Sequence, residues 1–499
     1  MVLFQAILEA LSFVFSWPVI GFVLLGTIIG LVFGALPGLG GTVAIALLIP
    51  VTFSFDARVA MVLLAATLGG VAFGGSISAI LINTPGTGPN AATMFDGYPM
   101  AQQGRANEAL AISATSSALG ALFGLVVLVI AIPFVREIIL SFTPPEFFWL
   151  SILGLTIIAL TAQGSFLKGI ASGGFGLMLS FIGFSGLFSS TRYTFGSNYL
   201  FDGIPLIPAI IGLFAVAEII NLTVKGGTIA NNNITEASGS VWKGVKTVLT
   251  RPRVFFQSAA TGTLIGMIPG SGGTVATFLS YMQAVQTSDN PEAFGKGEPS
   301  GIIASEAAND AKDGGALLPT VVFGIPGSAA MAVLLGGFIF HGFSPGRDLL
   351  DSNLNVLFSL IIALGLSNIF TSLIGLSLAN QLSKLTRVPV RLISPAVLTV
   401  ALVGAYSLSF IWGDVILAVI LGFIGYFMTV HNYSRVAVVI ALVLGPIMER
   451  AYTQSLQISG GEFGILYTRP ISIVLIVLTV LSIAAPIIRG RAKSRGDSL

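Results

Sequence analysis

Long uninterrupted apolar runs constrain the fold of this chain more than any other feature. Examples are residues 120–133, 206–220, 356–378 and 471–488. A helix that spans a bilayer needs about 20 apolar residues, and these runs approach or reach that length. Only 9% of the residues are charged, whereas a soluble domain carries about 25%. The runs predict an all-α polytopic membrane protein, because the strands of a membrane barrel would be short and alternating.

Several functional classes are excluded by what the composition lacks. The chain has no cysteine and two histidines, so thiolate catalysis and cysteine-ligated metals are excluded and a histidine-rich metal or haem site is not expected. A net charge of +2 indicates no strongly basic face for nucleic acid. The stretch "GLGGTVA" lacks the lysine of an ATP-binding phosphate loop. We expect no cofactor, no catalytic residues, and no metal beyond a possible Na⁺.

One polar stretch near the midpoint divides the chain. Residues 225–253 are rich in Gly, Asn, Ser and Thr and carry five basic residues. They are predicted to connect a first membrane repeat, 1–224, to a second, 254–468. A final transmembrane helix and a basic tail would then occupy 469–499. Short basic loops tend to stay in the cytoplasm, so the connector and the tail are predicted to be cytoplasmic.

The two halves repeat the same motifs in the same order. "GALPGLGGTVA" at 34–44 matches "GMIPGSGGTVA" at 266–276. "GGSISAILINTPGT" at 74–87 matches "GGALLPTVVFGIPGS" at 314–328, with one additional residue in the second copy. Two weaker matches follow in the same order. A duplicated unit explains this shared order.

The expected topology is inverted. If the connector is inside and the last helix is an extra one, each repeat crosses the membrane an odd number of times, and the two repeats have opposite orientations. This places the N-terminus on the periplasmic side, in agreement with its lack of Lys and Arg, which also argues against a cleaved signal peptide. Inverted repeats are common in secondary transporters, with the substrate at the repeat interface. We expect about 11 or 12 transmembrane helices, some broken or re-entrant.

Each repeat contains two Pro-Gly breaks that are expected to bind a ligand. Backbone groups freed inside a bilayer are costly unless protein or a water-filled cavity satisfies them. A helix that restarts after a break presents free N–H groups, which bind anions. The candidate substrate-binding residues are Pro37, Gly38, Gly40, Gly41, Thr42, Asn83, Thr84, Pro85, Gly86, Thr87, Gly270, Gly272, Gly273, Thr274, Pro326, Gly327 and Ser328. The alternative is that these are tight turns or close helix contacts.

A charged helix in the second repeat has an uncharged counterpart in the first. The segment 298–319 carries several charges, whereas the stretch around Gly74 has none. The polar residues that share one face of this helix are Glu306, Asn309, Asp310 and Asp313. Clustered carboxylates at membrane depth usually carry protons or bind cations, so these are the ion-coupling candidates. Two alternatives remain: the helix start lies in water, or Lys312 neutralises one carboxylate.

Over nearly its whole length the chain resembles the large membrane subunit of the tripartite tricarboxylate transporters, the TctA-type family. The stretches that carry the resemblance include "GALPGLGGTVAIALLIPVTF", "GGSISAILINTPGTGPNAATMFDGYPMAQQG", "FDGIPLIPAIIGLFAVAE", "GMIPGSGGTVATFLSY" and "GGALLPTVVFGIPGSAAMAVLLGGFIFHGFSPG". The resemblance implies a bacterial inner-membrane permease that works with a small membrane subunit and a periplasmic solute-binding protein. It implies carboxylate uptake driven by a Na⁺ or H⁺ gradient, and an elevator-like movement agrees with it.

The chain departs from the family pattern at two places that concern ion coupling. The family pattern has Asn-Asn where this chain has Asn309 and Asp310, and it has a charged residue shortly after "SY" where this chain continues "MQAV". Two other functional classes remain as alternatives: a gradient-uncoupled anion channel, and an intramembrane enzyme that uses paired carboxylates as acid and base. No histidine or cysteine cluster supports the enzyme. The substrate is not readable, because backbone N–H groups recognise any carboxylate.

Overall fold

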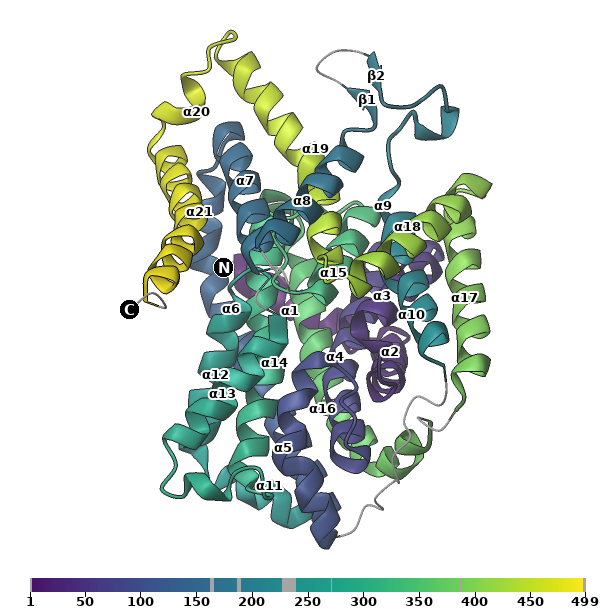
Figure 1. Ribbon diagram of the computed structural model, residues 1–499, viewed down its shortest axis with the longest axis vertical. Coiled ribbons are helices and arrows are strands. Elements are labelled where there is room, and N and C mark those ends of the chain that lie inside the picture. Colours follow the sequence, from purple (N-terminus) through teal and green to yellow (C-terminus); the bar gives the residue numbers. More distant parts are fainter. Residues whose placement is uncertain are drawn as a thin grey trace.

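The computed structural model describes residues 2–161, 166–185, 190–226, 239–270, 272–385 and 388–496. Within them the protein is helical apart from loops and one short hairpin (Figure 1). The hairpin pairs β1 (Gly183–Ser185) with β2 (Ser190–Arg192) in antiparallel register. Seven of the described helices are long and apolar enough to cross a membrane, or up to eight if a bent pair counts as one span. The prediction of an all-α polytopic membrane protein is therefore confirmed.

The described part of the first half of the chain contains ten α-helices. They are α1 (Val2–Val14), α2 (Val19–Ala35), α3 (Gly40–Val51), α4 (Ala57–Ile82), α5 (Ala91–Met100), α6 (Ala106–Leu140), α7 (Pro144–Thr161), α8 (Phe166–Ser180), α9 (Leu206–Ile210) and α10 (Ala217–Lys225). A 3₁₀ turn, η2 (Gly88–Asn90), precedes α5, and a π-helical segment, η5 (Ile211–Val216), joins α9 to α10.

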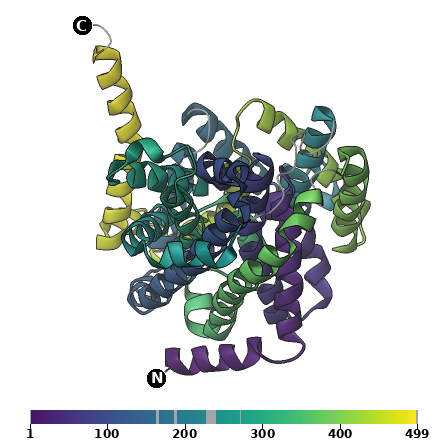
Figure 2. The ribbon, with the colours of Figure 1, turned by 90° about the horizontal axis from the view of Figure 1, so that it is seen from below.

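The second half begins with a short helix, α11 (Val241–Leu249), within the polar connector. The helices after it are α12 (Pro252–Gly266), α13 (Gly272–Gln286), α14 (Pro299–Phe323), α15 (Ala329–Phe340), α16 (Leu354–Leu385), α17 (Val390–Ser407), α18 (Trp412–Val430), α19 (Arg435–Ile458), α20 (Ile465–Thr468) and α21 (Pro470–Gly496). From below, α1 and α21 lie on the periphery of the bundle (Figure 2).

The number of full-length spans is smaller than the expected 11 or 12 crossings. Besides the seven spans, the described residues contain five shorter apolar helices, among them α3 and α15, which follow the Pro-Gly breaks. The bent pair is α1 and α2, at 77°. Breaks shorten these helices below the length of a full span, and α14 has the length but carries four charged side chains.

Close glycine contacts fix how the two repeats correspond. A Cβ atom at Gly34 in α2 would lie 2.2 Å from the carbonyl oxygen of Val71 in α4. A Cβ atom at Gly266 in α12 would lie 2.3 Å from the carbonyl oxygen of Lys312 in α14. Val71 therefore corresponds to Lys312, and Gly74 corresponds to Gly315. The additional residue that the sequence comparison placed in the second copy is not needed.

Each repeat packs its central helix against the other repeat. Helix α4 packs most extensively against α2 and α16, and α14 packs most extensively against α6 and α12. In both inter-repeat pairs the contacts advance together along the two helices, so the helices are parallel. These contacts are Arg58–Ser359 and Ala66–Ser367 for α4 and α16, and Ser117–Glu306 and Gly124–Ala311 for α6 and α14.

The two repeats have opposite orientations. Helices α6 and α16 occupy corresponding places after the second break of each repeat, and they run antiparallel. The Ser372 hydroxyl of α16 donates to the carbonyl of Ala114 in α6 at 2.8 Å. About two turns nearer the start of α16, Gly365 faces Leu125, which lies further along α6. Because α4 is parallel to α16 and α14 is parallel to α6, α4 and α14 are antiparallel, which confirms the inverted repeat.

The polar connector contains more structure than a linker. Residues 227–238 lie outside the described residues, but α11 packs along α6. Lys243 forms an ion pair with Glu108 at 3.2 Å, and Gly244 contacts the Glu108 backbone closely. Arg105 holds the same carboxylate at 2.8 Å. The basic side chain at 243 therefore fastens the connector to the first repeat. The domain boundaries inferred from the sequence remain a prediction.

Candidate functional site

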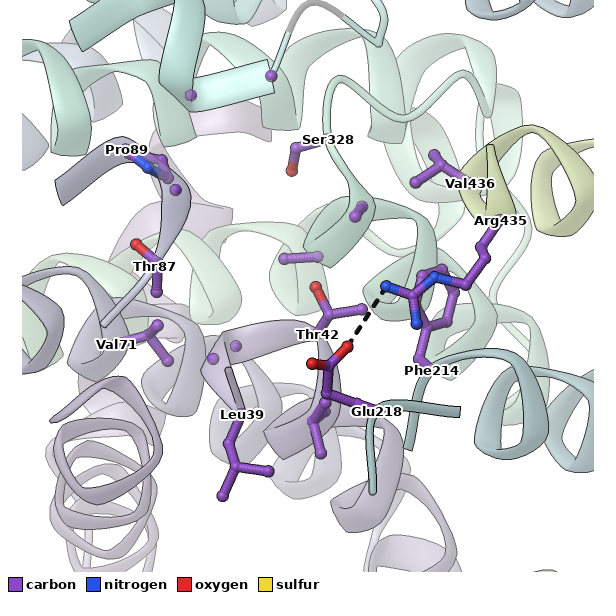
Figure 3. A pocket seen from close by; sticks show the side chains of 18 of the residues that line it. Leu39, Thr42, Val71, Thr87, Pro89, Phe214, Glu218, Ser328, Arg435 and Val436 are labelled. Atoms are coloured by element: carbon purple, nitrogen blue, oxygen red, sulfur yellow. Dashed lines mark ion pairs between the residues drawn. The ribbon is translucent and has the colours of Figure 1, made fainter. Parts of the chain in front are cut away.

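A cavity of about 580 Å³ lies between the two repeats. Its walls include the first break of each repeat, at 38–43 and around Gly272, and the second break of each repeat, at 85–89 and 328–330. Residues 432–436, which lead into α19, complete the wall. Figure 3 shows Thr42, Thr87, Ser328 and Arg435 around the same space. The duplicated motifs, which are 232 positions or more apart in the sequence, therefore meet in one place.

The first breaks have the same backbone conformation in both copies. Gly38 and Gly40 have φ angles of +91° and +51°, and Gly270 and Gly272 have φ angles of +72° and +71°. Glycine adopts this left-handed region at no steric cost. A new helix begins at the second glycine of each pair, α3 in the first repeat and α13 in the second. The glycine pairs of the motif are therefore needed to end one helix and restart the next within a few residues.

The second breaks also have the same structure in both copies. Each contains a glycine that packs closely against the helix preceding the first break. Helices α4 and α14 end at residues in the left-handed conformation, Asn83 and Gly324. A Cβ atom at Gly86 would lie 2.0 Å from the carbonyl oxygen of Gly34. At the corresponding Gly327 it would lie 2.7 Å from the carbonyl oxygen of Gly266. Only glycine permits this approach, which holds the two breaks of each repeat together.

Four helices begin at the cavity wall: α3, α13, α15 and α19. The first turn of a helix has unpaired N–H groups and the positive end of the helix dipole, and both favour anions. Ser328 caps α15 by accepting a hydrogen bond from the amide of Met331 at 3.3 Å, and Ser434 caps α19 in the same way at 3.2 Å. The convergence of these helix starts therefore favours an anion without requiring a charged side chain.

Arg435 adds a formal positive charge to this wall. Its guanidinium lies 3.5 Å from the carboxylate of Glu218 and donates to the carbonyl of Leu213 at 3.2 Å (Figure 3). The same group lies over the ring of Phe214, 5.5 Å from its centre. A guanidinium has five N–H donors, and these contacts occupy only part of them. The remaining donors can bind an anion in the cavity.

The two central helices line the cavity with different side chains, polar from α14 and apolar from α4. Helix α14 contributes Asn309, Lys312 and Asp313, whose counterparts in α4, also in the wall, are Leu68, Val71 and Ala72. Lys312 pairs with Asp313 at 2.7 Å. The amide nitrogen of Asn309 has no hydrogen-bond partner among the described residues. Asn309 therefore brings an unsatisfied buried donor to the cavity wall.

The structure divides the sequence-predicted residues into two groups. Those in the cavity wall are Gly38, Gly40, Gly41, Thr42, Pro85, Gly86, Thr87, Gly270, Gly272, Gly273, Asn309, Asp313 and Ser328. Those outside the wall are Pro37, Asn83, Thr84, Thr274, Pro326, Gly327, Glu306 and Asp310. Two residues of the second group have structural roles at the breaks. Asn83 ends α4, and Gly327 packs against the backbone of Gly266.

Glu306 and Asp310 lie inside the protein. Their side chains are 0% and 1% exposed, so neither carboxylate is on the surface of the protein. The carboxylate of Glu306 accepts hydrogen bonds from Ser76 at 2.7 Å, from Ser117 at 3.0 Å, and from Thr93. The polar face of α14 is thus shared between two environments, the cavity and the packed interior beside α6.

Sequence reasoning missed Glu218 and Arg435. Both occur in helices that are otherwise long and apolar enough to cross a membrane, 206–225 and 435–458. An ionisable residue within such a segment is by default a candidate functional residue, with a partner to be sought. That signal was present in the sequence. The pairing of the two was not readable, since 217 positions separate them.

A membrane bundle of inverted repeats, with broken helices around a cavity at the repeat interface, has the architecture of a secondary transporter. The chain belongs to the tripartite tricarboxylate transporter TctA family, whose model matches residues 20–440. This family comprises the large membrane subunit of a transport system that also contains a binding protein and a small membrane subunit. It is a family of transporters and not of enzymes.

The relatives that match the chain are described as uncharacterized. One, a 52.8 kDa protein of the TAR-I ttuC′ 3′ region of Agrobacterium vitis, is 32% identical over 457 residues, 91% of this chain and 89% of the relative. Another, from the TAR-II ttuC′ 3′ region of the same organism, is 30% identical over 222 residues, 44% of this chain and 92% of the relative. No solved structure matches the chain.

Proposed function

We propose that this protein is the permease subunit through which a bacterium imports organic carboxylates across its inner membrane, driven by a Na⁺ or H⁺ gradient. The observation that supports this most is the cavity itself, where four helix starts and the guanidinium of Arg435 converge. This chemistry suits a carboxylate. A periplasmic binding protein would deliver the substrate and the small membrane subunit would complete the permease. In this proposal the C-terminus is cytoplasmic and the N-terminus periplasmic.

The residues in the wall would divide the recognition of the substrate between backbone and side chains. Backbone N–H groups at the starts of α3, α13 and α15 would bind carboxylate oxygens without selecting one acid. Hydroxyl groups of Thr42, Thr87 and Ser328 would add donors. Arg435 and Lys312 would fix the second charge of a di- or tricarboxylate. The volume of about 580 Å³ is large enough for such a molecule.

Movement of the substrate would be elevator-like. The tips at the second breaks, around Thr87 and Ser328, come from opposite repeats and line the same cavity. Because the repeats are inverted, one tip would face each side of the membrane. The close contacts of Gly86 and Gly327 bind each tip to its own repeat, so the tips would move with the helices behind them.

Single cysteines at Thr87 and Ser328 test this movement. The chain has no cysteine, so each variant carries one reactive thiol in an otherwise natural background. The expected result is that substrate and coupling ion change the rate of modification by a membrane-impermeant reagent at both positions. Ser197, which is exposed in a loop, provides the control Ser197→Cys, whose modification should not change. Constant modification at Thr87→Cys and Ser328→Cys would contradict the proposal.

Accumulation distinguishes a coupled transporter from an anion channel. Proteoliposomes would contain this chain with its small subunit, with candidate binding proteins outside, and uptake of labelled citrate and C4-dicarboxylates would be followed under imposed Na⁺ or H⁺ gradients. The expected result is accumulation above the external concentration that needs both a gradient and a binding protein. Flux that only equilibrates the substrate, with or without a gradient, would identify a channel and overturn the proposal.

A further inference from the structure

Helix α14 of the second repeat carries more buried negative charge than the one basic side chain on it can balance. Helix α14 carries Glu306, Asp310 and Asp313 and one basic residue, Lys312, whose ammonium is 2.7 Å from Asp313. Among the described residues no ion pair involves Glu306 or Asp310. The charged groups near Asp310 are those same three side chains of α14, and the groups that face Glu306 are hydroxyls. Buried charge of one sign is costly unless a bound cation or proton neutralises it.

The side chains that hydrogen-bond to Glu306 are all hydroxyls. Hydroxyls from three helices, Ser76 of α4, Thr93 of α5 and Ser117 of α6, donate to Glu306. The Ser117 hydroxyl also lies beside Asp310, but neither carboxylate oxygen of Asp310 has a hydrogen-bond partner of normal geometry. Hydroxyl groups around one carboxylate, with a second carboxylate unsatisfied beside it, suit a small hard cation or a proton.

A fourth buried hydroxyl, that of Ser113, is also available. The Ser113 side chain of α6 is 0% exposed and faces Glu306, and its oxygen has no partner of normal geometry among the described residues. Buried polar atoms are nearly always hydrogen-bonded. The unsatisfied oxygens of Ser113 and Asp310 therefore point to a ligand that belongs between α6 and α14.

We propose that Glu306 and Asp310, with the hydroxyls of Ser76, Thr93 and Ser117, form a buried site for one small monovalent cation, Na⁺ or a proton. The inference rests on the proposed function, since it gives the place where the driving ion binds. The site occurs in one repeat only. At the corresponding positions of α4 the chain has Ala65 and Gly69.

A chain of hydrogen bonds joins this cation site to the cavity. Thr87, in the cavity wall, donates to the side-chain oxygen of Asn90. The amide of Asn90 donates to the Ser76 hydroxyl at 2.8 Å and to the carbonyl of Ala72 at 3.0 Å. Ser76 in turn donates to Glu306 at 2.7 Å. A ligand at either end orders the same four side chains.

The link makes Asn90 a positioning residue for coupling. It is 0% exposed, and it packs so closely that a Cβ atom at Gly75 would lie 2.1 Å from its side-chain oxygen. Its counterpart in the second repeat is Met331, which cannot form the same bonds. If binding at one end favours binding at the other, the effect must be reciprocal. The carboxylate should therefore raise the affinity for the cation, and the cation should raise the affinity for the carboxylate.

Cation binding by the purified full-length protein in lipid nanodiscs tests the site. One arm titrates radioactive Na⁺ against choline, and the other follows proton uptake with a dye at constant ionic strength. The expected result is saturable binding in one arm that Asp310→Asn and Glu306→Gln weaken by at least about tenfold, with Ser117→Ala as a milder variant in case these fail to fold.

Asp414→Asn is the control for this experiment. Asp414 is another buried acid that accepts hydrogen bonds from hydroxyls, those of Tyr199 and Ser409. Binding in neither arm, or undiminished binding in Asp310→Asn, would overturn the site.

The link to the cavity is tested with Asn90→Ala. In the natural protein a transported carboxylate is expected to raise the cation affinity by about tenfold. Asn90→Ala should keep cation binding without substrate but lose most of this increase, and an undiminished increase would overturn the link. Failure of the proposed function would be distinct, because the natural protein would then show no gradient-driven carboxylate uptake whatever its cation binding.

Discussion

Arg435→Gln is expected to reduce the apparent affinity for the carboxylate about 100-fold. Arg435 is the guanidinium in the cavity wall, and its ion pair with Glu218 at 3.5 Å leaves donors for a substrate. Removal of one partner of a largely desolvated charge pair costs about 2–5 kcal/mol, and about 1.4 kcal/mol corresponds to tenfold. The substitution also leaves Glu218 as an unpaired negative charge beside the cavity, which repels an anion. Uptake by proteoliposomes over a range of substrate concentrations measures the change.

Two further variants make the Arg435 experiment specific. Arg435→Lys retains the charge but not the planar fork of donors, so an intermediate loss is expected. Arg136→Gln breaks another arginine ion pair, with Asp351 at 2.5 Å, and Arg136 is outside the cavity wall. Its uptake should equal that of the natural protein. Unchanged uptake by correctly folded Arg435→Gln would show that the guanidinium does not contact the substrate.

Gly86→Ala is expected to destabilise the protein by about 3 kcal/mol and to abolish uptake. The new methyl group would lie 2.0 Å from the carbonyl oxygen of Gly34 and 2.4 Å from the Cα atom of Gly75. Both neighbours are backbone atoms and cannot turn away as a side chain can, so the tip must move off α2. Overpacking of this kind costs about 1–3 kcal/mol, occasionally more. The thermal midpoint of the purified protein measures the loss of stability.

Two other glycine-to-alanine variants, at Gly327 and Gly174, test whether the loss of stability depends on how close the new methyl group lies to other atoms. Gly327→Ala should be less harmful, because its new methyl group would lie 2.7 Å from the carbonyl oxygen of Gly266. Gly174 lies within α8 with no atom near the position of a Cβ. Gly174→Ala should be neutral or stabilising by up to about 1 kcal/mol. Equal midpoints for Gly86→Ala and Gly174→Ala would show that the close approach is absent.

Much of the architecture was predictable because it depends on local composition. Apolar runs predict spanning helices, and the glycines at 38 and 40 and at 270 and 272 predict breaks, since each signal acts within a few residues. The alignment of the copies was less secure. Each copy contains two consecutive glycines, so the sequence alone does not show which glycine corresponds to which. The sequence comparison paired Gly74 with Gly314. Contacts between α2 and α4, and between α12 and α14, show that Gly315 is the partner.

The composition of the site was less predictable because it depends on packing between distant segments. Glu306, Asn309, Asp310 and Asp313 share one face of an isolated helix, as the spacing indicates. In the folded protein the cavity borders Asn309 and Asp313, whereas hydroxyl-bearing helices surround Glu306. One polar face thus serves two environments. The helical periodicity of the sequence does not show where the cavity ends and the packed interior begins along this face.

A structure of the protein in lipid nanodiscs, determined by cryo-electron microscopy with a saturating transported carboxylate, would test most directly whether the cavity between the inverted repeats holds the substrate. The expected result is density for the carboxylate between the tips at Thr87 and Ser328, within hydrogen-bond distance of Arg435 and of the amides that begin α3 and α13. Density for the bound carboxylate elsewhere in the protein, with this cavity empty, would contradict the assignment.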